Sequence, residues 1–177
     1  MSGPHTAAWE EAEASCPIDV LVFPTLELQH PAFLEAGFPV ALRFVLDVQP
    51  RSLGIETGAL FNGGTLQTFK PITFEAKPPS FEEGKVPECR VVFDNVGRDL
   101  MPYLNEAVKV RADLILIYRE YRDDDVVEPC YGPVEFVVRQ VRITGARVEG
   151  TAKLSDLANA KFPSRVYTRT GFPALVP

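Results

Sequence analysis

Alternation of apolar and polar residues is the feature that most constrains what this chain can fold into. In the segment VALRFVLDV, residues 40–48, Arg43 and Asp47 lie on one face of an extended chain, and only apolar residues lie on the other. The apolar set is Val40, Leu42, Phe44, Leu46 and Val48. A period of two is typical of a β-strand that buries one face. We therefore expect this segment to line the core of a β-sheet.

The same alternation recurs along the chain and predicts at least six strands. The further candidates are IDVLVF (18–23), TLELQH (25–30), LQTFKPITFEA (66–76), CRVVF (89–93), ADLILIYREY (112–121) and VEFVVRQVRITGARVEGTAKL (134–154). Proline cannot donate to a sheet ladder, so Pro24 predicts a bend or edge position and Pro71 an edge or bulged strand. The last segment is either a strand pair or one strand bent at Gly145.

The strand at 112–121 begins with residues that are apolar on both faces and ends in charged residues. Strands with two apolar faces lie inside a sheet that is covered on both sides. We expect Arg119, Glu120 and Arg122 to mark the end of this strand that faces solvent or a partner.

Two helices are predicted. In residues 6–15, TAAWEEAEAS, Thr6 can cap a helix and helix-forming residues follow it. Pro17 ends this predicted helix. A central helix follows Asp94–Asn95, with Pro102 in its first turn. Leu100, Leu104 and Val108 recur there at helical spacing, so this face should pack on the sheet.

These elements predict a mainly β (α+β) fold, namely an antiparallel β-barrel or sandwich with one central helix and a short N-terminal helix. A chain of 177 residues accommodates one compact domain with extensions. We divide it into an N-terminal helical extension (1–17), a β domain (18–154) and a C-terminal docking segment (155–177). The C-terminal segment is rich in Phe, Pro and aliphatic residues, and it packs either on its own sheet or on a neighbouring subunit.

The sequence offers few residues for catalysis. The only histidines are His5 near the N-terminus and His30, which we interpret as a turn residue at a strand end. The three cysteines lie far apart in the sequence without a CxxC pair. Asp123–Asp125 could bind a cation, but a solvated turn is the favoured interpretation. We expect no enzymatic activity, no cofactor and no metal.

Net charge and hydropathy argue against two classes of partner, nucleic acids and membranes. The net charge of −6 argues against a protein that grips nucleic-acid phosphates, which normally has a basic face. No secretory leader and no apolar run of membrane-helix length is evident in the sequence. We expect synthesis in a cytoplasm-like compartment and no membrane partner.

Three stretches resemble a known family. They are TLELQHPAF, then VVFDNVGRDLMPYLNEAV followed by LILIYREY, and finally DLANAKFPSRVYTRTGFPALVP. From about residue 15 to residue 177 the chain resembles small minor tail proteins, of unknown function, of long-tailed (siphovirus-type) bacteriophages and prophages. The C-terminal pattern is the most specific part, with Asp156-Leu157-Ala158-Asn159 followed by Phe162-Pro163-Ser164-Arg165 and Phe172-Pro173.

The resemblance implies a structural protein of the virion tail tip, made in the bacterial host cytoplasm. It implies a tail-tube type of fold assembled as a distal-tail or baseplate ring around the DNA channel. The implied partners are copies of the chain itself and the tail tube, tape measure and hub or tip proteins, and no catalytic residues are implied. The termini and the long loop predicted by the Pro, Gly and charged residues of KPPSFEEGKVPE (77–88) would then contact neighbouring subunits. The expected interface residues are Trp9, Phe81, Phe162, Arg165, Tyr167, Phe172 and Leu175.

Three alternatives stay open at this point. The chain could be a component of a trimeric baseplate hub, a host-surface or carbohydrate-binding module, or a tail-assembly chaperone that is absent from the finished virion. A carbohydrate-binding module would present clustered exposed aromatic residues. The only tryptophan, Trp9, lies instead in the predicted N-terminal helix.

Overall fold

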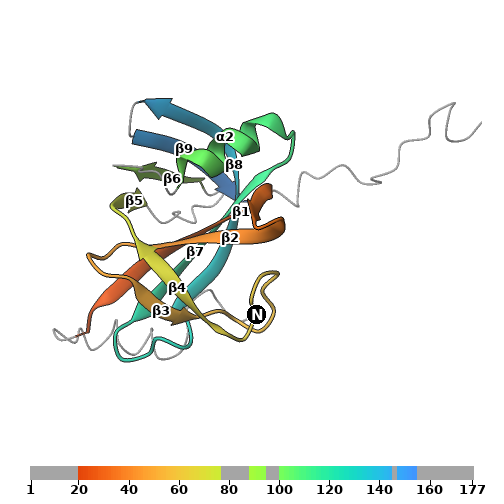
Figure 1. Cartoon of the computed structure of the whole chain (residues 1–177). Helices are drawn as coiled ribbons and strands as arrows, with labels where there is room; N and C mark the ends of the chain where they lie inside the picture. The colour runs from red at the N-terminus through yellow and green to blue at the C-terminus, as the bar shows by residue number, and fades with distance from the viewer. Residues whose placement is uncertain (1–19, 77–87, 95–99, 145–146, 155–177) are drawn as a thin grey trace, which may run out of the picture.

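The computed structural model of the protein describes residues 20–76, 88–94, 100–144 and 147–154, which form a mainly β fold with one helix (Figure 1). The predicted N-terminal helix, residues 77–87 of the predicted loop and the segment 155–177 lie outside the described residues. The elements are β1 (Val22–Glu35), β2 (Phe38–Val45), β3 (Arg51–Gly54), β4 (Leu66–Pro71), β5 (Phe74–Ala76), β6 (Glu88–Phe93), α2 (Met101–Lys109), β7 (Leu114–Arg122), β8 (Tyr131–Thr144) and β9 (Arg147–Leu154).

The described strands form one open, mixed sheet. Its nine strands lie in the order β3-β4-β2-β1-β7-β8-β9-β6-β5. The strand pairs are antiparallel as predicted, apart from β2 and β4, which are parallel. In Figure 1, α2, β6 and β9 gather at one end of the molecule and β3 and β4 at the other, with β1, β7 and β8 running between them.

The sheet curls strongly because the segment that contains β4 and β5 bends between them. Pro71 interrupts the segment, as its missing amide predicts. The Ile72 amide donates to the Val45 carbonyl at the end of β2 (3.1 Å), and the Asp94 amide after β6 donates to the Thr73 carbonyl (3.1 Å). Two consecutive residues thus bond to strands that lie far apart in the sheet order.

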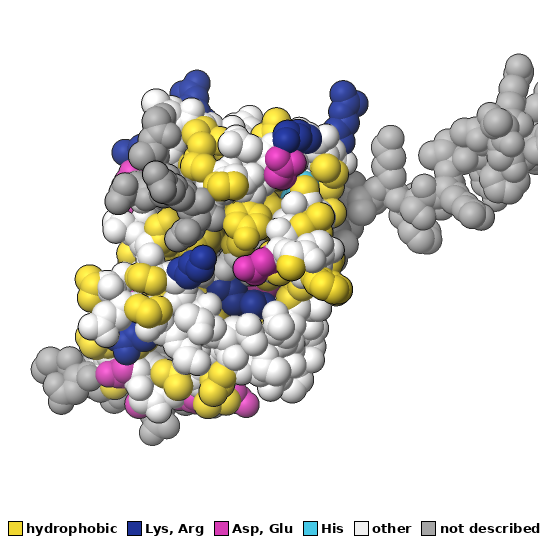
Figure 2. Space-filling model, in the orientation of Figure 1, with side chains coloured by type: hydrophobic (Ala, Val, Ile, Leu, Met, Phe, Trp, Pro, Cys, Tyr) yellow, Lys and Arg dark blue, Asp and Glu magenta, His cyan; other side chains and the backbone are white. Residues whose placement is uncertain are grey.

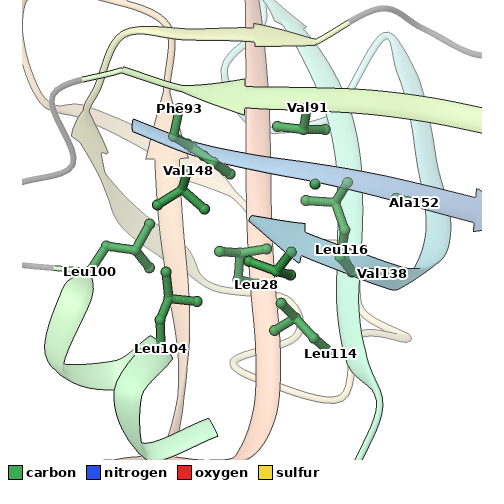
Figure 3. Close-up of a pocket in the computed structure, with 12 residues that line it drawn as sticks. Leu28, Val91, Phe93, Leu100, Leu104, Leu114, Leu116, Val138, Val148 and Ala152 are labelled. Atoms are coloured by element: carbon green, nitrogen blue, oxygen red, sulfur yellow. The ribbon is translucent and has the colours of Figure 1, made fainter. Parts of the chain in front are cut away.

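The curl encloses the larger apolar core. Phe44 of β2 and Phe93 of β6 meet inside it, with ring centroids 6.0 Å apart in an edge-on arrangement. Helix α2 packs on this core through Leu100 and Leu104, which are 1% and 4% exposed, and Pro102 lies in its first turn as predicted (Figure 3). The prediction for Val108 is wrong, because it is 81% exposed in the last turn. Ala107, seven residues after Leu100, continues the packed face instead.

The apolar alternation of residues 40–48 extends beyond the strand it predicts. Strand β2 ends at Val45, and Leu46 and Val48 are exposed. The chain turns there because Asp47 organises the bend: its carboxylate accepts from the Val48 amide (2.6 Å) and pairs with Arg51 (2.5 Å). The prediction that Leu46 and Val48 line the core is therefore wrong.

A smaller apolar cluster lies on the opposite face of the central strands. Its buried members are Phe23, Val45, Leu53, Ile55, Phe69 and Tyr121. Pro24 lies within β1, opposite Glu120 of β7, and its carbonyl accepts from the Leu46 amide (3.0 Å). Most residues of β1 are buried on both of its faces. The face that carries the polar residue Glu27 is covered by the segment that follows β3.

Candidate functional site

A buried ion-pair network joins β1, β2 and β7. Glu27 of β1 accepts hydrogen bonds from Arg43 of β2 (Nε to Oε2, 3.1 Å) and from Arg119 of β7 (Nη1 to Oε2, 3.1 Å). Its other oxygen accepts from Gln29 Nε2 (2.6 Å). The side chains of Glu27 and Arg119 are fully buried. The prediction that Arg119 faces solvent or a partner is therefore wrong.

The same two arginines hold the covering loop, residues 55–65, against the sheet. Arg119 binds the Glu56 carboxylate with two hydrogen bonds, Nε to Oε2 (2.9 Å) and Nη2 to Oε1 (2.7 Å). Arg43 donates to Asn62 Oδ1 (3.2 Å) and to the Phe61 carbonyl (3.1 Å). Two-pronged arginine–carboxylate pairs are strong and orientation-specific, so they fix the position of the loop.

The pKa shifts of Glu56 and Arg119 both favour the charged form of the side chain. Burial alone would raise the pKa of Glu56, but hydrogen bonds and charge from Arg119 outweigh it and hold that pKa below its usual value. Burial would lower the pKa of Arg119, but Glu56 and Glu27 more than compensate and raise it. Burial also raises the pKa of Tyr121, whose hydroxyl donates to the Gly54 carbonyl (2.6 Å) as a neutral phenol.

Backbone hydrogen bonds join the two ends of the covering loop. The Gly64 amide donates to the Ile55 carbonyl (2.9 Å), and the Ile55 amide donates to the Thr65 carbonyl (3.0 Å). Asn62 and Gly64 adopt positive φ angles of 56° and 72°, a conformation that Asn and Gly tolerate best. The sequence FNGG, residues 61–64, therefore forms a tight turn.

The carboxylates of the acidic turn Asp123–Asp125 bind neighbouring groups of the protein. Asp123 Oδ1 accepts from the Leu21 amide (3.2 Å), and Asp124 pairs with Arg122 (2.5 Å). Asp125 Oδ1 accepts from the amides of Val127 (3.0 Å) and Glu128 (3.2 Å). Within the described ranges, no group of three or more His, Cys, Asp or Glu side chains could hold a metal ion.

A groove of about 440 Å³ lies between residues 54–66 and residues 127–133. Its walls are residues 54–57 and 64–66 on one side and 127–129 and 132–133 on the other. Leu66 and Val127 line it and are 56% and 61% exposed. Glu56 and Glu128 also line it, so the groove combines apolar walls with acidic groups.

A second, much smaller cavity of about 20 Å³ lies in the larger core beneath α2 (Figure 3). Leu28, Leu104, Leu114 and Val148 are among the apolar side chains that point into it. The volume suffices for about one water molecule, but a buried water needs two or more polar partners, and the lining offers apolar surface only. This cavity is a packing gap rather than a ligand site.

His30 and Cys130 have structural contacts. His30 lies within β1 rather than in a turn, where Nδ1 accepts from the Ala32 amide (3.0 Å) and the ring packs on Phe33 at a centroid distance of 5.5 Å. The register of β1 shifts at this point, which explains the turn-like sequence. The Cys130 thiol donates to the Glu120 carbonyl (3.2 Å), and burial raises its pKa to about 11.

The residues that the sequence predicts for a subunit interface lie outside the described residues. They are Trp9, Phe81, Phe162, Arg165, Tyr167, Phe172 and Leu175. The structure instead reveals an exposed apolar pair at the β1–β2 hairpin, where Leu34 is 49% and Phe38 73% exposed. The Ala36-Gly37 turn between them has positive φ angles of 50° and 87°. An apolar-Gly-apolar hairpin is a weak sequence signal, and sequence reasoning missed it.

On the face shown in Figure 2, acidic and basic side chains are interspersed with small groups of apolar ones. In the part of the chain that the structure covers, no helix has the length and hydropathy required to cross a membrane.

These features define a mainly β domain with a curled mixed sheet, one packed helix and a covering loop locked by buried ion pairs. The chain belongs to the family described as Domain of unknown function (DUF1833), whose sequence model matches residues 8–167. A comparison with curated proteins gave no match.

Proposed function

We propose that this protein is a structural component of a bacteriophage tail tip. In this proposal, copies of the chain form a distal-tail or baseplate ring around the DNA channel and join the tail tube to the hub. The observation that carries the proposal is the sequence resemblance to minor tail proteins. Its most specific part is the pattern Asp156–Asn159, Phe162–Arg165 and Phe172-Pro173.

The curled sheet supports the proposal. Tail-tube proteins of long-tailed phages share a β-barrel or sandwich with a flanking helix. Here the segment 66–76 contributes strands near both ends of the sheet order, and α2 packs on the enclosed core. We propose that this arrangement is a tail-tube type of barrel in which the segment 66–76 bridges β2 and β6.

Exposed apolar residues supply surface for neighbouring copies. Leu34 and Phe38 stand at a hairpin tip, where their burial would contribute to association. The proposed contacts with neighbours also include Trp9 and Phe81, together with residues of the C-terminal segment. Those residues are Phe162, Arg165, Tyr167, Phe172 and Leu175. Each contact is weak alone, but a closed ring repeats it at every interface.

A ring that continues a six-fold tube needs six tube-like domains. One domain per chain favours a hexamer over a trimeric hub, in which each chain carries two. The net charge of −6 suits a channel through which DNA slides without binding. No specific nucleic-acid binding and no catalytic step belong to this proposal.

Mass spectrometry of purified particles tests whether the protein is a virion component. The experiment uses the phage or induced prophage that encodes this chain. We expect the protein in intact particles at a stoichiometry similar to that of other tail-tip proteins. Its absence from particles, together with its presence in assembly intermediates, would favour a chaperone and contradict the proposal.

Complementation tests the proposed interface. We expect the double variant Phe172→Ala/Leu175→Ala to yield a folded subunit, as judged by circular dichroism and thermal melting, that is not incorporated into tails. The matched control Thr168→Ala/Thr170→Ala changes the same segment without removing a large apolar side chain and should support tail assembly. Normal infectious tails built from the double variant would refute the assigned role of these residues.

A further inference from the structure

A separate groove of about 560 Å³, here called the basic groove, lies on strands β6, β8 and β9. Its charged lining side chains are Arg90 of β6, Arg142 of β8 and Glu149 of β9. Glu149 alternates along β9 with the core residues Val148 and Ala152, so the groove lies on the face of the sheet that points away from the core. Two arginines against one glutamate give its lining a net charge of +1, in a protein whose net charge is −6.

The guanidinium of Arg142 is the positive charge that the basic groove offers to a partner. Arg90 Nη2 lies 3.5 Å from Glu149 Oε2, and the other oxygen of Glu149 binds Arg147 Nε (3.0 Å). Arg142 is exposed and lies opposite Glu149 in the strand register, but no acidic side chain of the described residues is within ion-pair distance of it. An acidic group from outside would therefore meet a guanidinium that these residues do not neutralise.

The turn between β7 and β8 presents the opposite charge. Asp123–Asp125 and Glu128 are exposed, and residues 122–128 hold these four carboxylates against the single guanidinium of Arg122, a net charge of −3. The turn is held in place, because the Gly54 amide donates to the Val126 carbonyl (2.8 Å). A segment that is already ordered loses little conformational entropy when it docks.

Strand β8 keeps the acidic turn and the basic groove of one chain apart. The turn leads into Tyr131, the first residue of β8, and Arg142 lies eleven residues further along the same strand. Eleven strand residues span about 36 Å. In Figure 1 the turn lies at the β3 end of the molecule and the tip of β8 at the α2 end. The basic groove therefore cannot reach the acidic turn of its own chain, but it can bind that of another copy.

We propose that the basic groove binds the acidic turn, residues 123–128, of a second copy of this chain. The contact joins two different surfaces, so its repetition produces a ring where the rotation closes and a filament where it does not. Opposite charges favour this head-to-tail order, and like charges oppose contacts between two equal ends. The inference rests on the proposed function, because it names a contact through which the copies of the ring would join.

Mixing of charge-reversed variants tests the contact on the purified full-length chain. Arg142→Glu should repel the acidic turn, and Glu128→Lys should repel the basic groove. Each variant alone should associate at least tenfold more weakly than the natural chain, as measured by sedimentation equilibrium in low salt. A mixture of the two variants should recover association, because the reversed groove of one faces the reversed turn of the other and the remaining two surfaces are unchanged.

The matched controls are Lys109→Glu and Glu106→Lys, which make the same changes of charge at exposed positions on α2, outside the basic groove. Both should associate like the natural chain, and circular dichroism and thermal melting should show that all variants are folded. Three results would each overturn the proposal: a natural chain that stays monomeric up to its limit of solubility, unchanged association in either the groove or the turn variant, and a mixture that associates as weakly as its components.

The salt dependence of the natural chain gives a second test that needs no variant. Exposed charges are screened by salt, so the dissociation constant should rise at least tenfold between about 50 mM and about 500 mM NaCl. Association that does not depend on salt would overturn the proposal. Neither test uses phage particles, so the contact can fail while the protein is found in purified tails, and it can hold while the protein is absent from them.

Discussion

The carboxylate of Glu27 and the guanidinium of Arg119 lie 3.1 Å apart, and neither side chain is exposed to solvent. Arg119 also binds Glu56, so it links a buried strand to the loop that covers it. A buried charge is tolerated when it is paired and fully hydrogen-bonded. The position of the covering loop, and with it one wall of the groove, therefore depends on this arginine.

Replacing Arg119 by methionine should destabilise the protein strongly. The variant leaves Glu27 buried with one cation fewer and releases Glu56, and breaking a buried pair costs about 3–5 kcal/mol. Chemical denaturation measures the free energy of unfolding. The control is Lys109→Met, which removes an exposed ion pair with Glu106 and should cost less than about 1 kcal/mol. Similar losses in both variants would contradict a buried network.

The stabilising effect of Glu56 should disappear in acid. Its pKa is lower in the folded protein than the ordinary value of 4.5, so its contribution is complete above that value and is lost as the pH falls through the folded pKa. The difference in unfolding free energy between the natural protein and Glu56→Gln should be constant around neutral pH and shrink below 4.5. A difference that persists unchanged in strong acid would show that the carboxylate charge is not what stabilises the loop.

Helix α2 should be stabilised by Leu104 and not by Val108. Leu104 is buried against the sheet, and Leu104→Ala should reduce the unfolding free energy by about 2–5 kcal/mol. Val108 is exposed, and Val108→Ala should change it by less than about 0.5 kcal/mol. Urea denaturation of both variants measures the contrast. Equal effects would mean that the helix packs through a different face.

Gly54 should not tolerate a side chain. A Cβ atom there would collide with the backbone carbonyl of Val127, where the Gly54 amide donates to the neighbouring Val126 carbonyl (2.8 Å). Gly54→Ala should therefore lower the melting temperature and increase proteolysis around residues 126–129. Gly58→Ala, where a Cβ meets no atom within 4 Å, is the control and should leave both unchanged. A Gly54→Ala variant with an unchanged melting temperature and unchanged proteolysis would contradict the close approach of these two segments.

The alternation of apolar and polar residues predicts most strands of this fold. Successive side chains of a strand point to opposite faces, so burying one face produces a pattern that repeats every two residues. Local sequence also places the break at Pro71 and the first helical turn at Pro102. For residues 134–154 it leaves a strand pair and one bent strand as alternatives, and the structure has the strand pair β8 and β9. Local sequence fails where distant segments decide the outcome. Arg119 is buried because Glu56, 63 residues earlier in the chain, covers it, and no local pattern contains that contact.

The groove could not be predicted from the sequence for the same reason. Its walls come from two segments, 54–66 and 127–133, which meet only through the fold. The sequence does not predict the parallel pairing of β2 and β4. A parallel pair requires a crossover connection, and the alternation of apolar and polar residues does not specify the path of that connection. By contrast, the tight turn at Asn62–Gly64 follows from residue type alone.

A density map of the tail tip of purified particles tests the central claim most directly. The account predicts copies of this chain in a closed ring around the DNA channel, with curled sheets side by side and C-terminal segments at the subunit interfaces. A tail tip in which no density fits this fold, or in which the chain sits away from the channel as isolated copies, would contradict it.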